Sequence, residues 1–198
     1  MNRRPLKSRQ SAWANGMARA LAAKGVSPNA ISLCSMAFAF VGAVVIVAGG
    51  PLGLVVGAIC CQLRLLCNLL DGLVAVEGGK GAPDGAFWNE VPDRVSDILF
   101  LCAAGLAAGQ PWLGAGAAVG AVTTAYVREF GRAEGLAADY RGPMAKPHRM
   151  AVLTIALVVA AVEPRALLAG LWIIMIGTGV TALRRGAGIV TALRSRAR

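Results

Sequence analysis

Acidic residues and histidine are scarce in this chain of 198 residues. It holds 10 Asp and Glu and a single histidine, His148, against 20 Lys and Arg, so its formal net charge is +10. Hydrophobic residues nevertheless make up 57% of the sequence, which excludes an ordinary soluble domain. A membrane protein with its charge confined to loops and ends has both properties, whereas a nucleic-acid binder would have a less apolar surface. We therefore expect an all-α integral membrane protein with no nucleic-acid partner.

The cysteines lack any spacing typical of a disulfide framework or a metal site. All five lie inside apolar runs, so we expect reduced thiols that pack as small apolar residues. The basic first ten residues are not followed directly by a short apolar core with a small-residue cleavage site, so no cleavable signal is expected. No internal repeat or second domain is evident.

Six apolar segments reach, or nearly reach, the roughly twenty residues that a membrane-spanning helix needs. They lie at about 28–47, 52–76, 85–108, 111–130, 150–162 and 166–183, between turns or loops that contain Gly or Pro. The fifth is short unless its helix begins inside the preceding loop. The expected domains are an N-terminal cytoplasmic amphipathic helix (1–25), a six-helix membrane domain (26–185) and a basic cytoplasmic tail (186–198).

The N-terminal segment places Trp13, Met17 and Leu21 on one helix face, as in an amphipathic helix lying on a membrane surface. A merely solvated basic tail is the alternative. Basic residues also indicate the orientation: eighteen of the twenty Lys and Arg fall at the two ends or near the second-to-third and fourth-to-fifth connections. By the positive-inside rule these parts are cytoplasmic, in a cell (inner) membrane, and the number of spans is even.

Polar side chains concentrate between positions 64 and 97, at the expected cytoplasmic mouth of the second and third spans. Two sets share a helix face because their members are three or four positions apart: Asn68 with Asp71, and Asn89 with Asp93 and Asp97. Carboxylates at membrane depth are costly and generally mark a functional site. Two such stripes, on helices joined by a Gly-rich hairpin, predict one cation-binding pocket.

The spacing of these residues resembles the signature of the CDP-alcohol phosphotransferase family, D-x2-D-G-x2-A-R-x8-G-x3-D-x3-D. Its positions fall on Asn68, Asp71, Gly72, Ala75, Val76, Gly85, Asn89 and Asp93. Every spacing is kept. However, Asn68 and Asn89 stand where the family has its first and third aspartates, and Val76 stands where it has arginine.

The resemblance implies a six-helix, often dimeric fold whose second and third helices hold one or two divalent cations, Mg²⁺ or Mn²⁺. It makes Asn68, Asp71, Asn89 and Asp93 the metal ligands and Asp93 also the base that deprotonates an acceptor hydroxyl. It places Gly72, Ala75 and Gly85 beside the nucleotide and diphosphate. The implied reaction, in phospholipid biosynthesis, moves a phosphatidyl group from a CDP-linked lipid to an alcohol and releases CMP.

The two asparagines each remove a negative charge from this site, which favours one metal ion or metal binding that depends on the substrate diphosphate. A further carboxylate could come from Glu77, Asp84, Glu90 or Asp97, and Asp97 is the best placed. Arg64, one turn before Asn68, either pairs with Asp71 or Asp97 or holds a phosphate of the donor.

Basic residues of the fourth-to-fifth connection form a second candidate site. As an anion pocket for the acceptor, they would bind its phosphate; alternatively they only satisfy membrane topology. These residues are Arg128, Arg132, Arg141, Lys146 and Arg149. His148 is not expected to be the base, because Asp93 already stands in that position. The basic loop suggests a phosphorylated polyol as acceptor.

Two other functions compete with a transferase. One is a degenerate relative that binds lipid or nucleotide without turnover, because its aspartates are lost. The other is a small transporter, which would spread polar residues through the spans. Their clustering at one mouth counts against a transporter.

Overall fold

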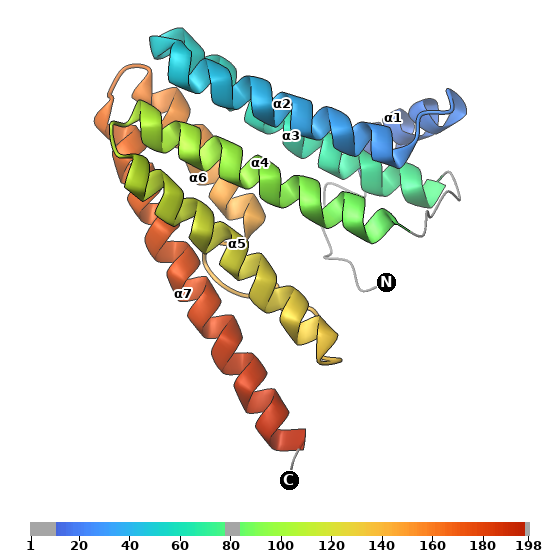
Figure 1. The fold of residues 1–198 in the computed structure, drawn as a ribbon. Coiled ribbons are helices and arrows are strands. Elements are labelled where there is room, and N and C mark those ends of the chain that lie inside the picture. The colour runs from blue at the N-terminus through green and yellow to red at the C-terminus, as the bar shows by residue number, and fades with distance from the viewer. Residues whose placement is uncertain (1–10, 78–83, 197–198) are drawn as a thin grey trace.

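The computed structural model describes residues 11–77 and 84–196, which form seven α-helices (Figure 1). Their bounds are α1 (Ala12–Ala23), α2 (Pro28–Ala48), α3 (Gly50–Glu77), α4 (Gly85–Ala107), α5 (Pro111–Ala133), α6 (Lys146–Ala160) and α7 (Arg165–Arg196). Helices α2 to α7 occupy the six segments expected from the apolar runs. The all-α fold class is therefore confirmed.

Three of these helices are long and apolar enough to cross a membrane by length and composition: α2, α3 over Gly50–Val76, and α7. Helices α4 and α5 have 23 residues each and α6 has 15, but none of them meets both criteria. Helix α6 begins inside the polar loop, as a longer fifth segment requires. Helix α7 continues through most of the expected basic tail, to Arg196.

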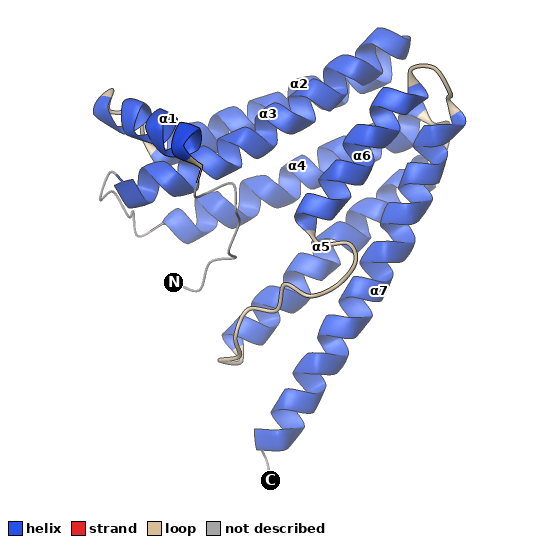
Figure 2. Cartoon of the chain, turned by 180° about the vertical axis from the view of Figure 1, so that it is seen from behind, coloured by secondary structure: helices blue, strands red, loops and turns tan. Residues whose placement is uncertain are grey.

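The helices form one connected bundle in which neighbours in sequence are not always neighbours in space. Helix α2 packs against both α3 and α4, α4 packs against α5, and α5 packs against α7. Helix α6 closes the bundle by packing against α3 and α7, as the rear view shows (Figure 2). Helices α5 and α7 diverge from α2–α4 toward the C-terminus (Figure 1). Few backbone positions of α3 and α4 approach one another, so side chains must bridge these two helices.

Glycine permits a close contact between α4 and α5. A Cβ on Gly114 of α5 would lie 2.6 Å from the Leu101 carbonyl oxygen and 2.7 Å from the Gly105 Cα of α4. Gly109, between the two helices, has φ of +67°, a conformation that favours glycine. These residues let α4 and α5 form a tight hairpin, as small residues do where membrane helices approach closely.

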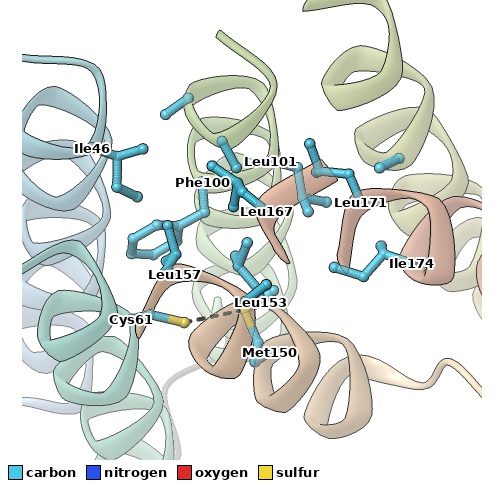
Figure 3. Packing of buried hydrophobic residues seen from close by; sticks show 14 of the residues in the cluster. Ile46, Cys61, Phe100, Leu101, Met150, Leu153, Leu157, Leu167, Leu171 and Ile174 are labelled. Atoms are coloured by element: carbon cyan, nitrogen blue, oxygen red, sulfur yellow. Dashed lines mark hydrogen bonds between the residues drawn. The ribbon is translucent and has the colours of Figure 1, made fainter. Parts of the chain in front are cut away.

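The apolar core lies where α4, α6 and α7 meet, with contributions from α2, α3 and α5. Figure 3 shows Phe100 and Leu101 of α4 packed among Leu153, Leu157 and Leu171. At one border the Cys61 thiol donates to the Met150 sulfur at 3.7 Å. This core fixes α3, α4 and α6 relative to one another, so that the polar residues next along these helices meet.

Helix α1 packs on α3 through a small separate cluster. Ala14 and Ala18 are fully buried there with Leu70 and Val74. Trp13 and Met17 remain 55% and 39% exposed, on a different part of the α1 surface.

Candidate active site

Asp93 of α4 is the centre of the polar cluster. Its Oδ1 accepts a hydrogen bond from Arg64 Nη2 at 3.2 Å and another from the Asn68 side-chain amide. Its Oδ2 accepts from Lys146 Nζ of α6. The structure thus brings together three predicted site residues from α3 and α4 with one from the basic connection.

Arg64 bridges α3 and α4 and is fully buried. The same Nη2 also donates to the Asp93 carbonyl oxygen at 3.0 Å and to Asp97 Oδ1 at 3.3 Å. Asp97 Oδ2 in turn accepts from Arg149 Nη2 at 2.5 Å. Arg64 forms ion pairs with Asp97 and Asp93 rather than with Asp71, and its predicted contact with a phosphate of the donor stays a prediction. Its Nε and Nη1 have no hydrogen-bond partner among the described residues.

Asp71 lies at the α2 side of the cluster and is 5% exposed. Its Oδ2 accepts from Ser32 Oγ at 2.8 Å, while its Oδ1 accepts no hydrogen bond within the described part of the chain. The Asn68 carbonyl oxygen accepts from Ser35 Oγ at 3.0 Å. Ser32 and Ser35 were not among the predicted site residues, although their spacing of three puts both on one face of α2.

The remaining signature residues lie around the mouth of the cluster. Asn89 is exposed, one turn before Asp93 on α4. Gly72 and Ala75 are half-buried on α3, and Gly85 begins α4. Their predicted place beside a nucleotide stays a prediction.

Among the three candidates for a further carboxylate whose side chains are described, Asp97 shares Arg64 with Asp93, and Glu90 reaches Asp93 only through Arg94, which lies 3.9 Å from Asp93 Oδ2. Asp84 accepts from the Trp88 indole at 2.9 Å and from Asn29 at 3.4 Å. Glu90 pairs with Arg94 and Arg128. The Glu77 side chain lies outside the described residues.

The basic connection divides into two groups. Lys146 and Arg149, at the start of α6, reach into the cluster. The other three pair with acids outside it: Arg128 with Glu90 at 2.6 Å and Glu129 at 2.8 Å, Arg132 with Glu129 at 2.8 Å, and Arg141 with Asp139 at 2.9 Å.

A cavity of about 200 Å³ lies beside this second group, between the end of α5, the loop and α7. Arg128, Asp139 and Arg141 supply its charged lining. The hydrogen bond from the Arg141 side chain lowers the pKa of Asp139 below its ordinary value, so this carboxylate stays ionised at neutral pH.

Arg185 of α7 was missed as a structural residue. It is 3% exposed, and it donates to the carbonyl oxygens of Thr124 at 2.8 Å and Arg141 at 2.9 Å. It therefore ties the loop to α5 and α7. The available signal was only an arginine near the end of an apolar run, which membrane topology explains equally well.

The donor set fits one hard cation better than two. Asp71 Oδ1 is a buried carboxylate oxygen without a partner, and the Asn68 amide oxygen lies one turn away on the same helix. Asp93 is already bound by Arg64 and Lys146, and Arg94 lies 3.9 Å from its Oδ2. Among the described residues no group of three or more His, Cys, Asp or Glu could hold a metal ion. Mg²⁺ accepts so few protein ligands because it usually keeps waters and binds substrate phosphates as well.

Comparison with known proteins identifies relatives across most of the chain. It is 26% identical over 189 residues to phosphatidylinositol phosphate synthase of Mycolicibacterium smegmatis, covering 89% of this chain and 83% of that protein. The Mycobacterium tuberculosis enzyme is 26% identical over 187 residues, with 85% and 82% covered. The chain is a homologue of CDP-alcohol phosphotransferases. No family model matches the chain.

A further relative of this CDP-alcohol phosphotransferase homologue covers only part of it. The archaetidylinositol phosphate synthase of Aeropyrum pernix is 33% identical over 94 residues, which is 47% of this chain and 48% of that enzyme.

Solved structures of the Mycobacterium tuberculosis phosphatidylinositol phosphate synthase share the fold of this homologue. The structure with CDP-DAG bound has a TM-score of 0.78 at 21% identity and covers 90% of this chain and 94% of its own. The complex with manganese and citrate has a TM-score of 0.77 at 22% identity, covering 90% and 89%. These structures show the shared fold, and the family resemblance inferred from the signature is confirmed by the sequence relatives above.

Proposed function

We propose that this chain is a membrane transferase that moves a phosphatidyl group from a CDP-linked lipid to an alcohol and releases CMP. The observation that carries the proposal is the buried convergence of signature residues Asn68, Asp71 and Asp93 with two cations of α6, Lys146 and Arg149. Relatives that match most of the chain are enzymes of this type.

We propose a phosphorylated polyol, of the inositol phosphate class, as the acceptor. The names of the mycobacterial and archaeal relatives give different lipid parts, phosphatidyl and archaetidyl, but the same inositol phosphate part. Arg128, Arg132 and Arg141 are suited to an acceptor phosphate because arginine binds phosphate with two parallel hydrogen bonds. Arg141 is the most accessible, with a side chain 67% exposed, and it borders the cavity beside α7.

The chemistry needs an oriented hydroxyl and compensation of charge on the phosphates. A divalent cation bound by Asp71, with Asn68 in support, would stabilise negative charge on the leaving CMP. Asp93 accepts the proton of the acceptor hydroxyl. Because Lys146 covers Asp93 Oδ2 and its side chain is 26% exposed, the acceptor displaces Lys146 toward solvent as it binds. Arg64 keeps Asp93 in place from the opposite side.

The finer membrane arrangement belongs to the same proposal. Helices α2 to α7 form six spans, and the ends of α3, α5 and α7 and the starts of α4 and α6 face the cytoplasm. Helix α1 lies at the membrane surface, with Trp13 and Met17 toward lipid, because these side chains are exposed on the surface that does not pack on α3. The chain acts as a homodimer, as the family resemblance implies.

CMP release tests the function directly. The purified chain, in lipid nanodiscs with CDP-diacylglycerol and Mg²⁺ or Mn²⁺, is offered inositol phosphate, glycerol 3-phosphate, serine and inositol in separate reactions. We expect metal-dependent CMP release with inositol phosphate and little with inositol. Protein that binds CDP-diacylglycerol but releases no CMP with any acceptor would contradict the transferase.

That contrary result would favour a binding protein without turnover. One observation supports this second candidate: Asp93, the proposed base, is held by Arg64, Asn68 and Lys146, and three donors weaken a carboxylate as a base.

A further inference from the structure

Charge in the buried cluster is balanced without any metal ion. Three carboxylates, of Asp71, Asp93 and Asp97, lie with three cations, of Arg64, Lys146 and Arg149. All six residues except Lys146 are less than 9% exposed. The formal charges of these six residues sum to zero, and Arg94, which lies 3.9 Å from Asp93, is itself paired with Glu90. Any ion that enters must therefore bring its own counter-charge or leave the site charged in a low-dielectric environment.

The donor of the proposed reaction brings such a counter-charge. Each of the two phosphates of a CDP-linked lipid carries one negative charge at neutral pH. One divalent cation with this diphosphate keeps the whole site neutral. A second divalent cation would leave two positive charges beside Arg64 and Arg149, which are 0% and 2% exposed and therefore shielded from water.

The side chains available as metal ligands also favour a single metal ion. A second metal ion would need Asp93, but Arg64, Asn68 and Lys146 bind both of its oxygens. Asn89, the other signature residue on α4, is exposed and carries no charge. Asp71 alone offers a buried carboxylate oxygen without a hydrogen-bond partner in the described structure.

We propose that this chain is a one-metal enzyme, in which Asp71 binds the single divalent cation and the fixed guanidinium of Arg64 takes the electrostatic role of a second ion. This inference rests on the proposed function. Nε and Nη1 of Arg64, buried and without a partner among the described residues, are the donors that an entering phosphate oxygen satisfies.

The test is a count of bound Mn²⁺ by electron paramagnetic resonance, on the full chain in nanodiscs saturated with CDP-diacylglycerol. We expect one tightly bound Mn²⁺ per chain and no spin coupling between ions. Two ions per chain, or a coupled pair, would overturn the proposal, and so would the absence of a tight ion. The count does not depend on turnover, so a chain that binds one ion but releases no CMP refutes only the proposed function.

Variants separate the role of the Asp71 carboxylate from that of the Arg64 guanidinium. Asp71→Asn should weaken Mn²⁺ binding by more than the roughly 10- to 100-fold typical of an outer-shell substitution. Arg184→Met removes one exposed arginine on the same side of the molecule and should leave the count at one. The triple variant Asn68→Asp, Asn89→Asp, Arg64→Met should bind a second, spin-coupled ion. If the triple variant does not fold, the wild-type count and Asp71→Asn still decide the matter.

Discussion

Asp93 is the residue on which the chemistry and the charge network both depend. Its carboxylate binds a guanidinium, an ammonium group and an amide, so its loss affects the two cations and the acceptor alike. Arg64 and Lys146 reach it from different helices. A substitution here must therefore be judged by its separate effects on turnover, on binding and on folding.

Asp93→Asn should lower the turnover of CDP-diacylglycerol by about 10²- to 10⁴-fold, the usual contribution of a general base. Binding of the CDP-lipid should persist, because Asp71 and the cations remain. The measurement is CMP release under saturating substrate, with lipid binding and thermal unfolding recorded for the same preparation. Equal turnover by this variant and the wild-type chain would contradict the assignment of Asp93 as the base.

We expect Asp97→Asn to lower the free energy of unfolding much more than Asp139→Asn, because Asp97 pairs with buried arginines and Asp139 with an exposed one. Asp97→Asn leaves Arg64 and Arg149 buried beside a neutral amide, and breaking a buried pair typically costs about 3–5 kcal/mol. Asp139→Asn breaks the pair with Arg141, whose side chain is 67% exposed, and should cost about 1 kcal/mol or less.

Thermal unfolding of both variants in one detergent measures this difference. A similar small loss in both would mean that the network around Asp97 does not stabilise the fold. Because hydrogen bonding lowers the pKa of Asp139, the stabilisation from its pair is present above an ordinary aspartate pKa of about 4. It is lost as the pH falls through the lowered value, and Asp139→Asn should remove that acid-side dependence.

At the scale of helices, hydrophobic patterning and turn residues predicted most of the element boundaries. The start of α2 at Pro28 and the start of α5 at Pro111 follow from proline in the first turn. The spacing of Asn68 and Asp71 on α3, and of Asp93 and Asp97 on α4, predicted that these polar faces would meet. Such predictions succeed because they depend on one helix or on two consecutive ones.

Contacts between distant helices could not be predicted in this way. Ser32 on Asp71 and Lys146 on Asp93 depend on how α2 and α6 pack against α3 and α4, which is set by side-chain fit in the core. For Arg64 the sequence left two possibilities open, because both an aspartate and a phosphate satisfy a buried guanidinium. The structure shows the ion pairs with Asp93 and Asp97, while the binding of a phosphate stays a prediction.

The α4–α5 hairpin offers a test of packing at this scale. In Gly114→Ala the new methyl group would lie 2.6 Å from a backbone carbonyl oxygen of α4, which cannot move aside as a flexible side chain would. Overpacking of this kind costs about 1–3 kcal/mol. The melting temperature in detergent should fall accordingly, and the control Gly179→Ala, with nothing within 4 Å of its added Cβ, should change it little. Equal melting temperatures would show that the hairpin is looser than described.

For the whole molecule, composition and charge predicted a helical membrane protein and the number of its main helices. Composition and charge did not predict two features: α6 is only 15 residues long, and α7 extends through most of the expected tail. Hydropathy does not register the extension of α7, because residues 184–196 are polar enough to leave the membrane yet still helical. There Arg196 donates to the carbonyl oxygen of Glu134 at 2.8 Å, and Arg185 to that of Thr124. These contacts hold the helix to the end of α5 and to the loop.

The orientation of the whole chain gives the last prediction. The end of α5 and the start of α6, which carries Lys146 into the site, should face the cytoplasm with both termini, because nearly all Lys and Arg lie on that side. In intact cells a membrane-impermeant maleimide should label Val162→Cys, in the α6–α7 turn, where the side chain is 85% exposed. It should label Ala133→Cys, at the exposed end of α5, only after permeabilisation, with the wild-type chain as background control. The opposite pattern would place the active site outside, away from nucleotide-activated donors. Labelling of both in intact cells would contradict the even number of spans.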